Sequence, residues 1–376
     1  MNPVVVVANF FGPKIYKPSL ILAAVIIITW PIDAGFFQFF FFFSAIALSS
    51  IIIWRAGDHF SPAAEFIEEH HNLPQSVKAA VIDAVASSFP EFAVAMIAVI
   101  FLGRFDVGVA TIAGSALYNV LVIPAAAGLV AATPLVVSRE VVWRDSLFYL
   151  MVVAVLIGTV MMFTEWSIGI ASLFFFIYVA YVILLHRHYK SHQKKTSHQE
   201  QESPSEEEEE EELHINTEKE AWSWIVGMML LMGGASHALV EASIGLGNLL
   251  GIDAVIMAFV VIAAGTSAPD TALSVLSAQR GNYDAAVSNV FGSNIFDICI
   301  CLSVPIALMF FGGSAFTLME MEHISLLWLL LLSTLIAIYF FYSNNYTLTK
   351  SKSILMLALY LAIVLYSLVL ATGVFG

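Results

Sequence analysis

Long apolar runs alternate with short polar stretches along almost the whole chain. We predict eleven membrane-spanning helices from this pattern, over residues 18–32, 36–56, 75–100, 107–133, 142–162, 166–186, 221–246, 253–279, 285–311, 322–342 and 353–373. An α-helix needs about 20 apolar residues to cross a bilayer. The pattern therefore predicts an all-α polytopic membrane protein, with ten core transmembrane helices and one extra N-terminal span.

The first span is short, and Pro31 and Asp33 follow it. A cleaved signal peptide is the competing interpretation of this segment. Against it, Lys14 and Lys17 lie late and no small-residue cleavage site is evident. The predicted organisation is an N-terminal extra span over 1–35, a first transmembrane repeat over 36–186, a polar loop over 187–220 and a second transmembrane repeat over 221–376.

Composition supports this class and locates the charge. Hydrophobic residues make up 60% of the chain and charged residues 12%, and the formal net charge is −14. Most of that charge belongs to residues 200–220, which hold eleven glutamates and one lysine. Runs of like charge stay solvated, so we expect a cytoplasmic, disordered loop. A low-affinity cation-sensing tail is the functional alternative.

Lysine and arginine in the short loops predict the orientation. With the N-terminus in the cytoplasm, all the basic loop residues except Arg104 fall on the cytoplasmic side, and the C-terminus is external. We expect a multi-pass protein of the plasma membrane. In this orientation the spans 75–100 and 253–279 run in opposite directions, which makes the two halves inverted repeats, a common architecture of secondary transporters.

A duplicated motif lies in these two spans. Residues 86–92 read ASSFPEF and residues 265–271 read GTSAPDT. Each is followed, 23 positions after Glu91 and 22 positions after Asp270, by a glycine–serine pair, in GSALYN at 114–119 and GSNIFD at 292–297. Carboxylates inside a membrane span are costly and mark ion or substrate pathways. The duplication therefore predicts an ion site at the interface of the repeats.

The chemistry of the motif favours a hard cation. Ser87 and Ser88 precede Glu91 by four and three residues, so all three share a helix face, as do Thr266, Ser267 and Asp270. Prolines 90 and 269 cannot donate to the carbonyls four residues back, so we expect each helix to be kinked or broken there. Carboxylate, hydroxyl and carbonyl oxygens suit calcium and sodium. Neither motif contains cysteine or histidine, which disfavours zinc and copper.

A purely structural interpretation is that the hydroxyls bond to their own helix and the prolines only bend it. It does not explain paired carboxylates at matching positions. The glycine–serine pairs allow close helix approach. Asn119 and Asp297 follow those serines by four residues, on the same face, and Asp297 gives the second repeat an additional acid.

These motifs resemble those of the cation/calcium exchanger superfamily, the sodium/calcium exchangers and their potassium-dependent relatives. GTSAPDT followed by DAAVSNVFGSNIFD is a specific match, whereas ASSFPEF followed by DVGVATIAGSALYN is looser. The resemblance covers both repeats and implies four ion sites near the middle of the membrane. It implies calcium ligands at Glu91, Asp270, Ser88 and Thr266. The implied sodium ligands are Ala84, Ser87, Ser88, Glu91, Ser115, Ala263, Thr266, Ser267, Asp270 and Ser293, with Asn119 and Asp297 as central support or as a potassium or proton site.

We therefore expect a secondary antiporter that exchanges sodium for calcium by alternating access. The alternative is a proton-coupled calcium or magnesium exchanger. We expect no enzymatic activity, because the Gly-x-Gly-Asp motif of intramembrane aspartyl proteases is absent; a passive channel remains a rival. We expect no cofactor: calcium and sodium, with potassium or a proton as a further candidate, are cargo. The expected partners are the lipid bilayer and inorganic cations, with no nucleic acid, and the sequence does not give an oligomeric state.

Three further polar residues lie near the motifs. Asp83 has no acidic counterpart in the second repeat, and it is a proton site, an entrance ligand or a bond to a neighbouring helix. His59 and His237 occupy similar places before each motif, and we expect structural bonds for both.

Overall fold

Helices account for nearly all of the ordered chain in the computed structural model, which describes residues 3–30, 32, 34–71, 84–163, 166–193, 215–312, 324–343 and 345–371. Helix α1 (Pro3–Thr29) is the extra N-terminal element, and the first repeat contains α2 (Gly35–His70), α4 (Ala84–Ile100), α5 (Phe105–Val130), α6 (Arg139–Met162) and α7 (Ile168–Gln193). The second contains α8 (Glu218–Leu250), α9 (Ala254–Met257), the π-helix η2 (Ala258–Ile262), α10 (Ala263–Thr266), α11 (Ala268–Gln279), α12 (Tyr283–Phe296), the π-helix η3 (Asp297–Cys301), α13 (Ser303–Gly312), α14 (Ile324–Tyr342) and α15 (Lys350–Ala371). The all-α membrane fold predicted from the sequence is confirmed.

The number of spans is less sharply defined. Among the described residues, eight helices are long and apolar enough to cross a membrane, or up to nine if the bent pair Ala254–Thr266 and Ala268–Gln279 is one span. The described apolar part of α4, Ser87–Ile100, is shorter than that length. The count of eleven therefore stays a prediction.

Several element bounds differ from the predicted ones. The first helix begins at Pro3 rather than at 18, and Gly12 interrupts it with a φ of 70° that favours glycine. Helix α2 extends to His70, well past the predicted end at 56, because the amphipathic segment after Trp54 continues the helix beyond the apolar run. Helix α7 likewise continues to Gln193. The acidic run 206–212 lies outside the described residues.

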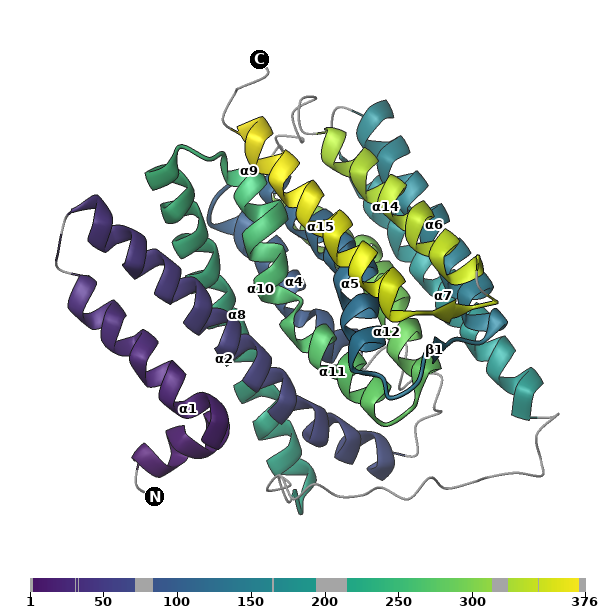
Figure 1. Cartoon of the computed structure of the whole chain (residues 1–376), viewed down its shortest axis with the longest axis horizontal. Coiled ribbons are helices and arrows are strands. Elements are labelled where there is room, and N and C mark those ends of the chain that lie inside the picture. The colour runs from purple at the N-terminus through teal and green to yellow at the C-terminus, as the bar shows by residue number, and fades with distance from the viewer. Residues whose placement is uncertain are drawn as a thin grey trace.

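A buried helix forms the centre of the molecule. In the apolar window of α5, 89% of the residues are buried, against 17% for α15 and for α2. Figure 1 shows α5 in the middle behind α15, which packs against it, with α1, α2 and α8 along one side and α6, α7 and α14 along the other. A two-residue antiparallel pairing of β1 (Leu135–Val136) with β2 (Thr347–Leu348) joins the segments that follow α5 and α14.

Corresponding helices of the two repeats run antiparallel. The end of α2 meets the start of α8, where His71 Nε2 lies 3.2 Å from Glu218 Oε1. At the other end of this pair, Gly35 packs beside Leu249. In the same way the segment after α5 meets the start of α12, where the hydroxyls of Thr133 and Tyr283 are 2.8 Å apart. These contacts give the inverted repeats that the sequence predicted.

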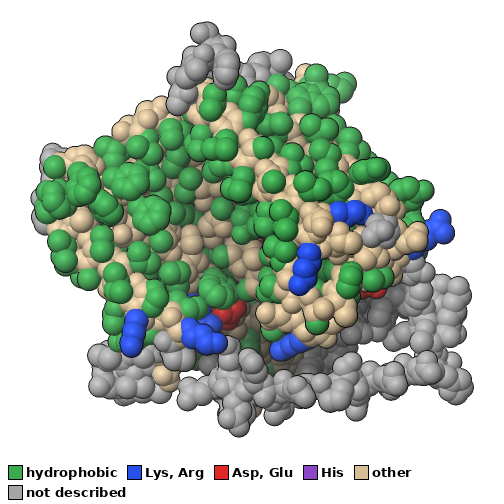
Figure 2. All heavy atoms as spheres, viewed as in Figure 1, with side chains coloured by type: hydrophobic (Ala, Val, Ile, Leu, Met, Phe, Trp, Pro, Cys, Tyr) green, Lys and Arg blue, Asp and Glu red, His purple; other side chains and the backbone are tan. Residues whose placement is uncertain are grey.

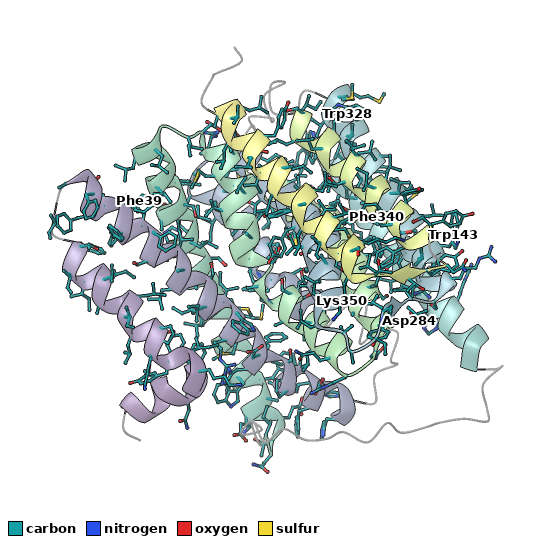
Figure 3. All side chains as sticks on the ribbon, in the orientation of Figure 1. Phe39, Trp143, Asp284, Trp328, Phe340 and Lys350 are labelled. Carbon is teal, nitrogen blue, oxygen red and sulfur yellow. The ribbon has the colours of Figure 1, made fainter. Side chains whose placement is uncertain are left out.

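The outer surface suits a bilayer. Large apolar side chains such as Phe36, Ile27, Leu230 and Phe311 are exposed, and Figure 2 shows green apolar side chains over most of the visible face, with lysine and arginine in its lower half. Figure 3 places Phe39 on α2 and Trp328 on α14 at this periphery. Apolar exposure on this scale is expected where lipid, not water, is the solvent.

Candidate functional site

The duplicated motifs meet at the centre of the molecule. Helices α4 and α5 bring residues from the first repeat, and α10, α11, α12 and η3 bring those from the second. All the polar side chains of the predicted site that the structure describes are buried, with at most 2% of their surface exposed: Ser87, Ser88, Glu91, Ser115, Asn119, Thr266, Ser267, Asp270, Ser293 and Asp297. Such a concentration of buried polar groups is costly unless the groups bond to one another or to a ligand.

The carboxylate of Glu91 is held from both repeats. Ser115 on α5 donates to Glu91 Oε1 over 3.2 Å, and Ser267, between α10 and α11, does so over 3.4 Å. The two hydroxyls are themselves 2.9 Å apart. Glu91 of the first repeat therefore accepts a hydrogen bond from Ser267, which lies three residues before Asp270 of the second repeat.

The carboxylate of Asp270 is held in the matching way. Ser293 on α12 donates to Asp270 Oδ2 over 2.8 Å and lies 2.8 Å from the hydroxyl of Ser88 on α4. In the alignment of the motifs Ser88 corresponds to Ser267, and Ser293 to Ser115. The two hydroxyl pairs are therefore related by the pseudo-two-fold axis of the repeats, which is direct evidence that the duplicated sequences build one symmetric site.

The amides break this symmetry. Asn119 Nδ2 donates to Asp270 Oδ2 over 3.1 Å and to Asn294 Oδ1 over 3.0 Å. Asn294 in turn donates to the carbonyl of Ala116 over 3.2 Å. Asn294 was not among the predicted site residues, although its position beside Ser293, where the first repeat has alanine, was a usable signal. Asn294 links α12 to α5 across the axis.

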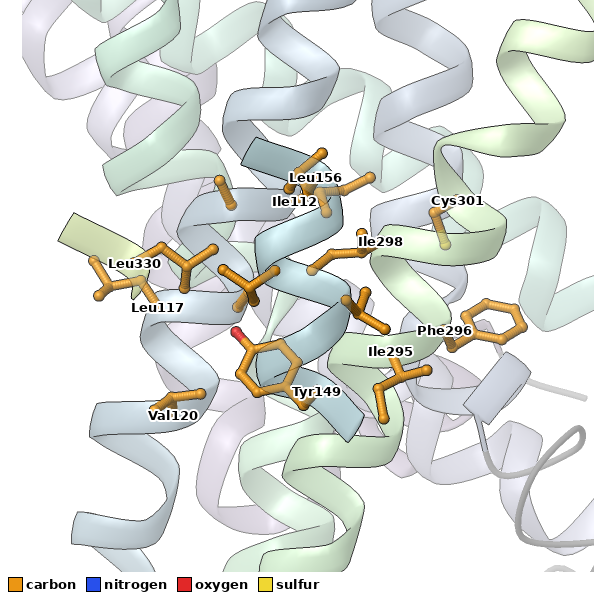
Figure 4. Packing of buried hydrophobic residues seen from close by; sticks show 14 of the residues in the cluster. Ile112, Leu117, Val120, Tyr149, Leu156, Ile295, Phe296, Ile298, Cys301 and Leu330 are labelled. Carbon is orange, nitrogen blue, oxygen red and sulfur yellow. The ribbon is translucent and has the colours of Figure 1, made fainter. Parts of the chain in front are cut away.

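Asp297 forms the second departure from symmetry. It opens the π-helix η3 and lies close enough to Glu91 and Asp270 to interact with both electrostatically. The thiol of Cys301, at the other end of η3, lies 3.8 Å from Asp297 Oδ1 and 3.9 Å from the carbonyl oxygen of Ser88. Cys301 was not among the predicted site residues either, because it follows the motif rather than belonging to it. Figure 4 shows the apolar wall beside this point, with Ile298, Ile295 and Tyr149.

Several oxygens of the site have no hydrogen-bond partner. They are Ser87 Oγ, Glu91 Oε2, Asn119 Oδ1, Asp270 Oδ1 and Asp297 Oδ2, all fully buried. Buried polar atoms are nearly always satisfied in folded proteins, so a set of orphans in one place needs an explanation such as an ion. Oxygen ligands from acids, an amide and a hydroxyl fit a hard cation.

The described part of the chain contains no group of three or more histidine, cysteine, aspartate or glutamate side chains arranged to hold a metal. A cation in this site would therefore depend on the acids in pairs, supplemented by hydroxyls and carbonyls.

The two predicted carbonyl ligands, Ala263 and Ala84, differ in how much of their surroundings the structure describes. The oxygen of Ala263 accepts from Thr266 Oγ1 and from the Ser267 N–H, each over 3.1 Å. A sodium ion there would displace one of these donors. Ala84 is the first residue described in α4. Asp83 lies outside the described residues.

The predicted helix breaks occur in one repeat only. Between α10 and α11 the helix axis bends by 45° at Ser267, next to Pro269. Helix α4 instead continues through Pro90 without interruption. The expected break is therefore wrong for Pro90, whereas a kink there, the other form of the expectation, stays a prediction.

The two glycines before the central serines are also unequal. A Cβ atom on Gly114 would lie 2.0 Å from the carbonyl oxygen of Phe259 in η2, so no other residue fits there. A Cβ on Gly292 would meet only the Tyr181 hydroxyl, at 3.7 Å. The predicted close approach is confirmed for Gly114, and it is wrong for Gly292, where α7 leaves room.

A small cleft opens on one side of the site, lined by Gly57, Asp58, Ser61, Pro269 and Leu273. It separates α2 from α11 beside the bend that precedes Asp270. At its edge Arg55 forms an ion pair with Asp58 over 2.7 Å.

Other polar residues near the motifs have structural roles. His59 bonds through Nδ1 to the Arg55 carbonyl over 2.8 Å, as expected. His237 is exposed and contacts the ring of Phe101. Asp106 forms a bidentate pair with Arg104 at the start of α5, and Asp284 accepts from the Ser138 N–H at the start of α12 (Figure 3).

The fold and the site together define an inverted-repeat secondary transporter for cations. The sodium/calcium exchanger protein family profile matches residues 41–186 and 220–369, and the chain belongs to this family. Human sodium/potassium/calcium exchanger 5 is 25% identical over 370 residues, covering 75% of this chain and 73% of the relative.

Two solved structures share the fold. One is the sodium–calcium exchanger NCX_Mj soaked with sodium and strontium, with a TM-score of 0.56 and 20% identity, covering 85% of this chain and 96% of that one. The other is the H⁺/Ca²⁺ exchanger CAX, with a TM-score of 0.64 and 15% identity, covering 95% and 93%. The chain is thus a multi-pass integral membrane exchanger.

Proposed function

We propose that this protein exchanges sodium for calcium across the plasma membrane by alternating access, with both ions bound between the two repeats. The observation that carries the proposal is the set of buried, unpartnered oxygens on Glu91, Asp270, Asp297, Asn119 and Ser87. These atoms come from both repeats, and no lysine or arginine among the described contacts neutralises them. A cation supplies the missing charge and the missing bonds at once.

The acids explain why transport would be coupled exchange rather than leakage. Glu91 and Asp270 lie within electrostatic range of each other, so two charged carboxylates in this dry environment would repel each other unless cations lay between them. Either one divalent ion or several monovalent ions relieve this repulsion. The two loads compete for the same oxygens, which makes release of one the condition for binding of the other.

We propose calcium ligands at Glu91, Asp270, Ser88 and Thr266. We assign sodium to oxygens of Ala84, Ser87, Ser88, Glu91, Ser115, Ala263, Thr266, Ser267, Asp270 and Ser293. Asn119 and Asp297 are the candidates for central support or for potassium or a proton. The name of the human relative includes potassium, and Asp297 is the residue here that adds a third charge.

We also propose that the cleft beside Pro269 faces the cytoplasm. It lies toward the end of the molecule where Lys219 stands in the first turn of α8 and Arg280 directly follows α11. Basic residues favour the cytoplasmic side of a membrane. The start of α1 and the end of α15 lie at opposite ends in Figure 1, which agrees with a cytoplasmic N-terminus and an external C-terminus.

The test is calcium uptake into proteoliposomes containing the purified protein. An outward sodium gradient should drive calcium uptake, and potassium should be varied independently on both sides. Uptake driven by a proton gradient with no requirement for sodium would replace the proposal with a proton-coupled calcium or magnesium exchanger. Calcium flux that needs no counter-ion at all would identify a channel.

A further inference from the structure

The thiol of Cys301 lies against the ion site without belonging to either motif. Its sulfur is 3.8 Å from Asp297 Oδ1 and 3.9 Å from the Ser88 carbonyl oxygen. The residue is completely buried. The thiol of Cys301 therefore lies beside both a carboxylate of the second repeat and a backbone oxygen of the first.

A second observation indicates that an oxygen atom of Asp297 is available to bind a ligand. Asp297 Oδ2 is buried and has no hydrogen-bond partner. The π-helix η3 places Asp297 and Cys301 one turn apart, so both side chains emerge on the same side. Ser88 belongs to α4, which brings the third potential ligand from the opposite repeat.

The ligand chemistry differs from that of the rest of the site. Carboxylate, hydroxyl and carbonyl oxygens select hard ions such as calcium, whereas a thiolate selects soft ones. A sulfur and an oxygen less than 4 Å apart can bind the same ion, because metal–sulfur and metal–oxygen bonds of about 2.3 and 2.1 Å span such a separation.

We propose that Cys301 Sγ, Asp297 and the Ser88 carbonyl form a subsite for soft divalent cations, of which cadmium is the representative probe. On binding, the sulfur coordinates as the thiolate and its proton passes to water. The subsite deepens the proposed function, because it shares Asp297 and Ser88 with the exchange site. A soft ion bound there competes with calcium and is held more tightly than an oxygen-only site would hold it.

The second cysteine provides a matched control. Cys299 is also fully buried and lies two residues away, but no hydrogen bond to the ion site is made by its thiol in the described structure. The chain has only these two cysteines. Cys299→Ser therefore leaves Cys301 as the single thiol, and Cys301→Ser leaves Cys299.

The experiment is a cadmium titration of the purified protein in detergent, followed through the ultraviolet charge-transfer absorbance of a cadmium–thiolate bond, with calcium as competitor. We expect the band in the wild type and in Cys299→Ser, and its loss in Cys301→Ser. We expect the ratio of cadmium to calcium affinity to fall at least about tenfold in Cys301→Ser and to stay unchanged in Cys299→Ser.

Absence of the band in Cys299→Ser overturns the proposal even if Cys301→Ser does not fold. So does an equal cadmium preference in Cys301→Ser and the wild type. The readout is binding and needs no transport, so a failure of sodium–calcium exchange in proteoliposomes is a separate result from a failure of this subsite.

Discussion

The two repeats carry nearly the same motif but differ in backbone geometry. In the first, α4 continues through Pro90 and α5 is one helix from Phe105 to Val130. In the second, the corresponding segments are bent by 45° before Pro269 and contain two π-helical turns, η2 and η3. The hydroxyl pairs at the centre remain related by the two-fold axis.

This difference separates two properties of the site. In the proposed exchange, the symmetric hydroxyls and acids would bind the ions, whereas the asymmetric backbone would determine on which side the ions enter. On one side Gly114 presses against the backbone of η2; on the other a cleft reaches Pro269 between α2 and α11. An exchanger built of inverted repeats can reverse its access when the repeats exchange these conformations.

The largest effect on exchange should come from neutralising the two acids at matching positions of the repeats. We expect Glu91→Gln and Asp270→Asn each to reduce calcium exchange to background, because a desolvated divalent ion requires opposite charge nearby. Both variants should remain folded, since an amide keeps the hydrogen bonds of one oxygen. Calcium flux in proteoliposomes and size-exclusion profiles are the measurements. Near wild-type exchange by either variant would show that the ion binds elsewhere.

The contact of Gly114 with η2 should be the next most sensitive point. Gly114→Ala places a methyl group against the Phe259 carbonyl, and overpacking of this kind costs about 1–3 kcal/mol. The matched variant Gly292→Ala has space for its methyl group. We expect a lower thermal unfolding temperature and slower exchange for Gly114→Ala only. Equal behaviour of the two variants would contradict the asymmetric packing.

Neutralising Asp297, the acid that replaces Asn119 of the first repeat, should have a smaller and more specific effect on exchange. We expect Asp297→Asn to leave calcium–sodium exchange measurable while changing its dependence on potassium or pH, because one buried acid is both a cation ligand and a proton acceptor. Exchange would be measured over a series of potassium concentrations and pH values. Superimposable profiles for wild type and variant would make Asp297 a structural residue.

The acidic loop should matter least. Deleting residues 197–213 removes the glutamate run but keeps Thr217, whose hydroxyl accepts from the Glu220 N–H and caps α8. We expect the rate at saturating ions to change by less than about twofold, as for a solvated tail. A large loss of exchange in folded protein would instead identify a cation-sensing role.

Much of the site could be predicted because its residues lie in a duplicated pattern. The spacing of ASSFPEF and GTSAPDT from their glycine–serine pairs identified both acids and their hydroxyls, and the structure brings all of these together at the centre. Asn294 and Cys301 could not be identified in that way. They have no counterpart in the other repeat, and their contacts, with Ala116 and with Ser88, join residues 178 and 213 positions apart.

The sequence by itself determined the membrane class, the inverted repeats and the polar residues of the site, because hydropathy and duplication are local properties of a chain. Only the tertiary structure decided which proline breaks its helix and which glycine is in close contact. Pro90 and Pro269 are chemically identical, as are Gly114 and Gly292, and the two glycines differ in the segments that pack beside them. That depends on packing between segments far apart in the sequence, where a backbone carbonyl such as that of Phe259 leaves no space for a side chain.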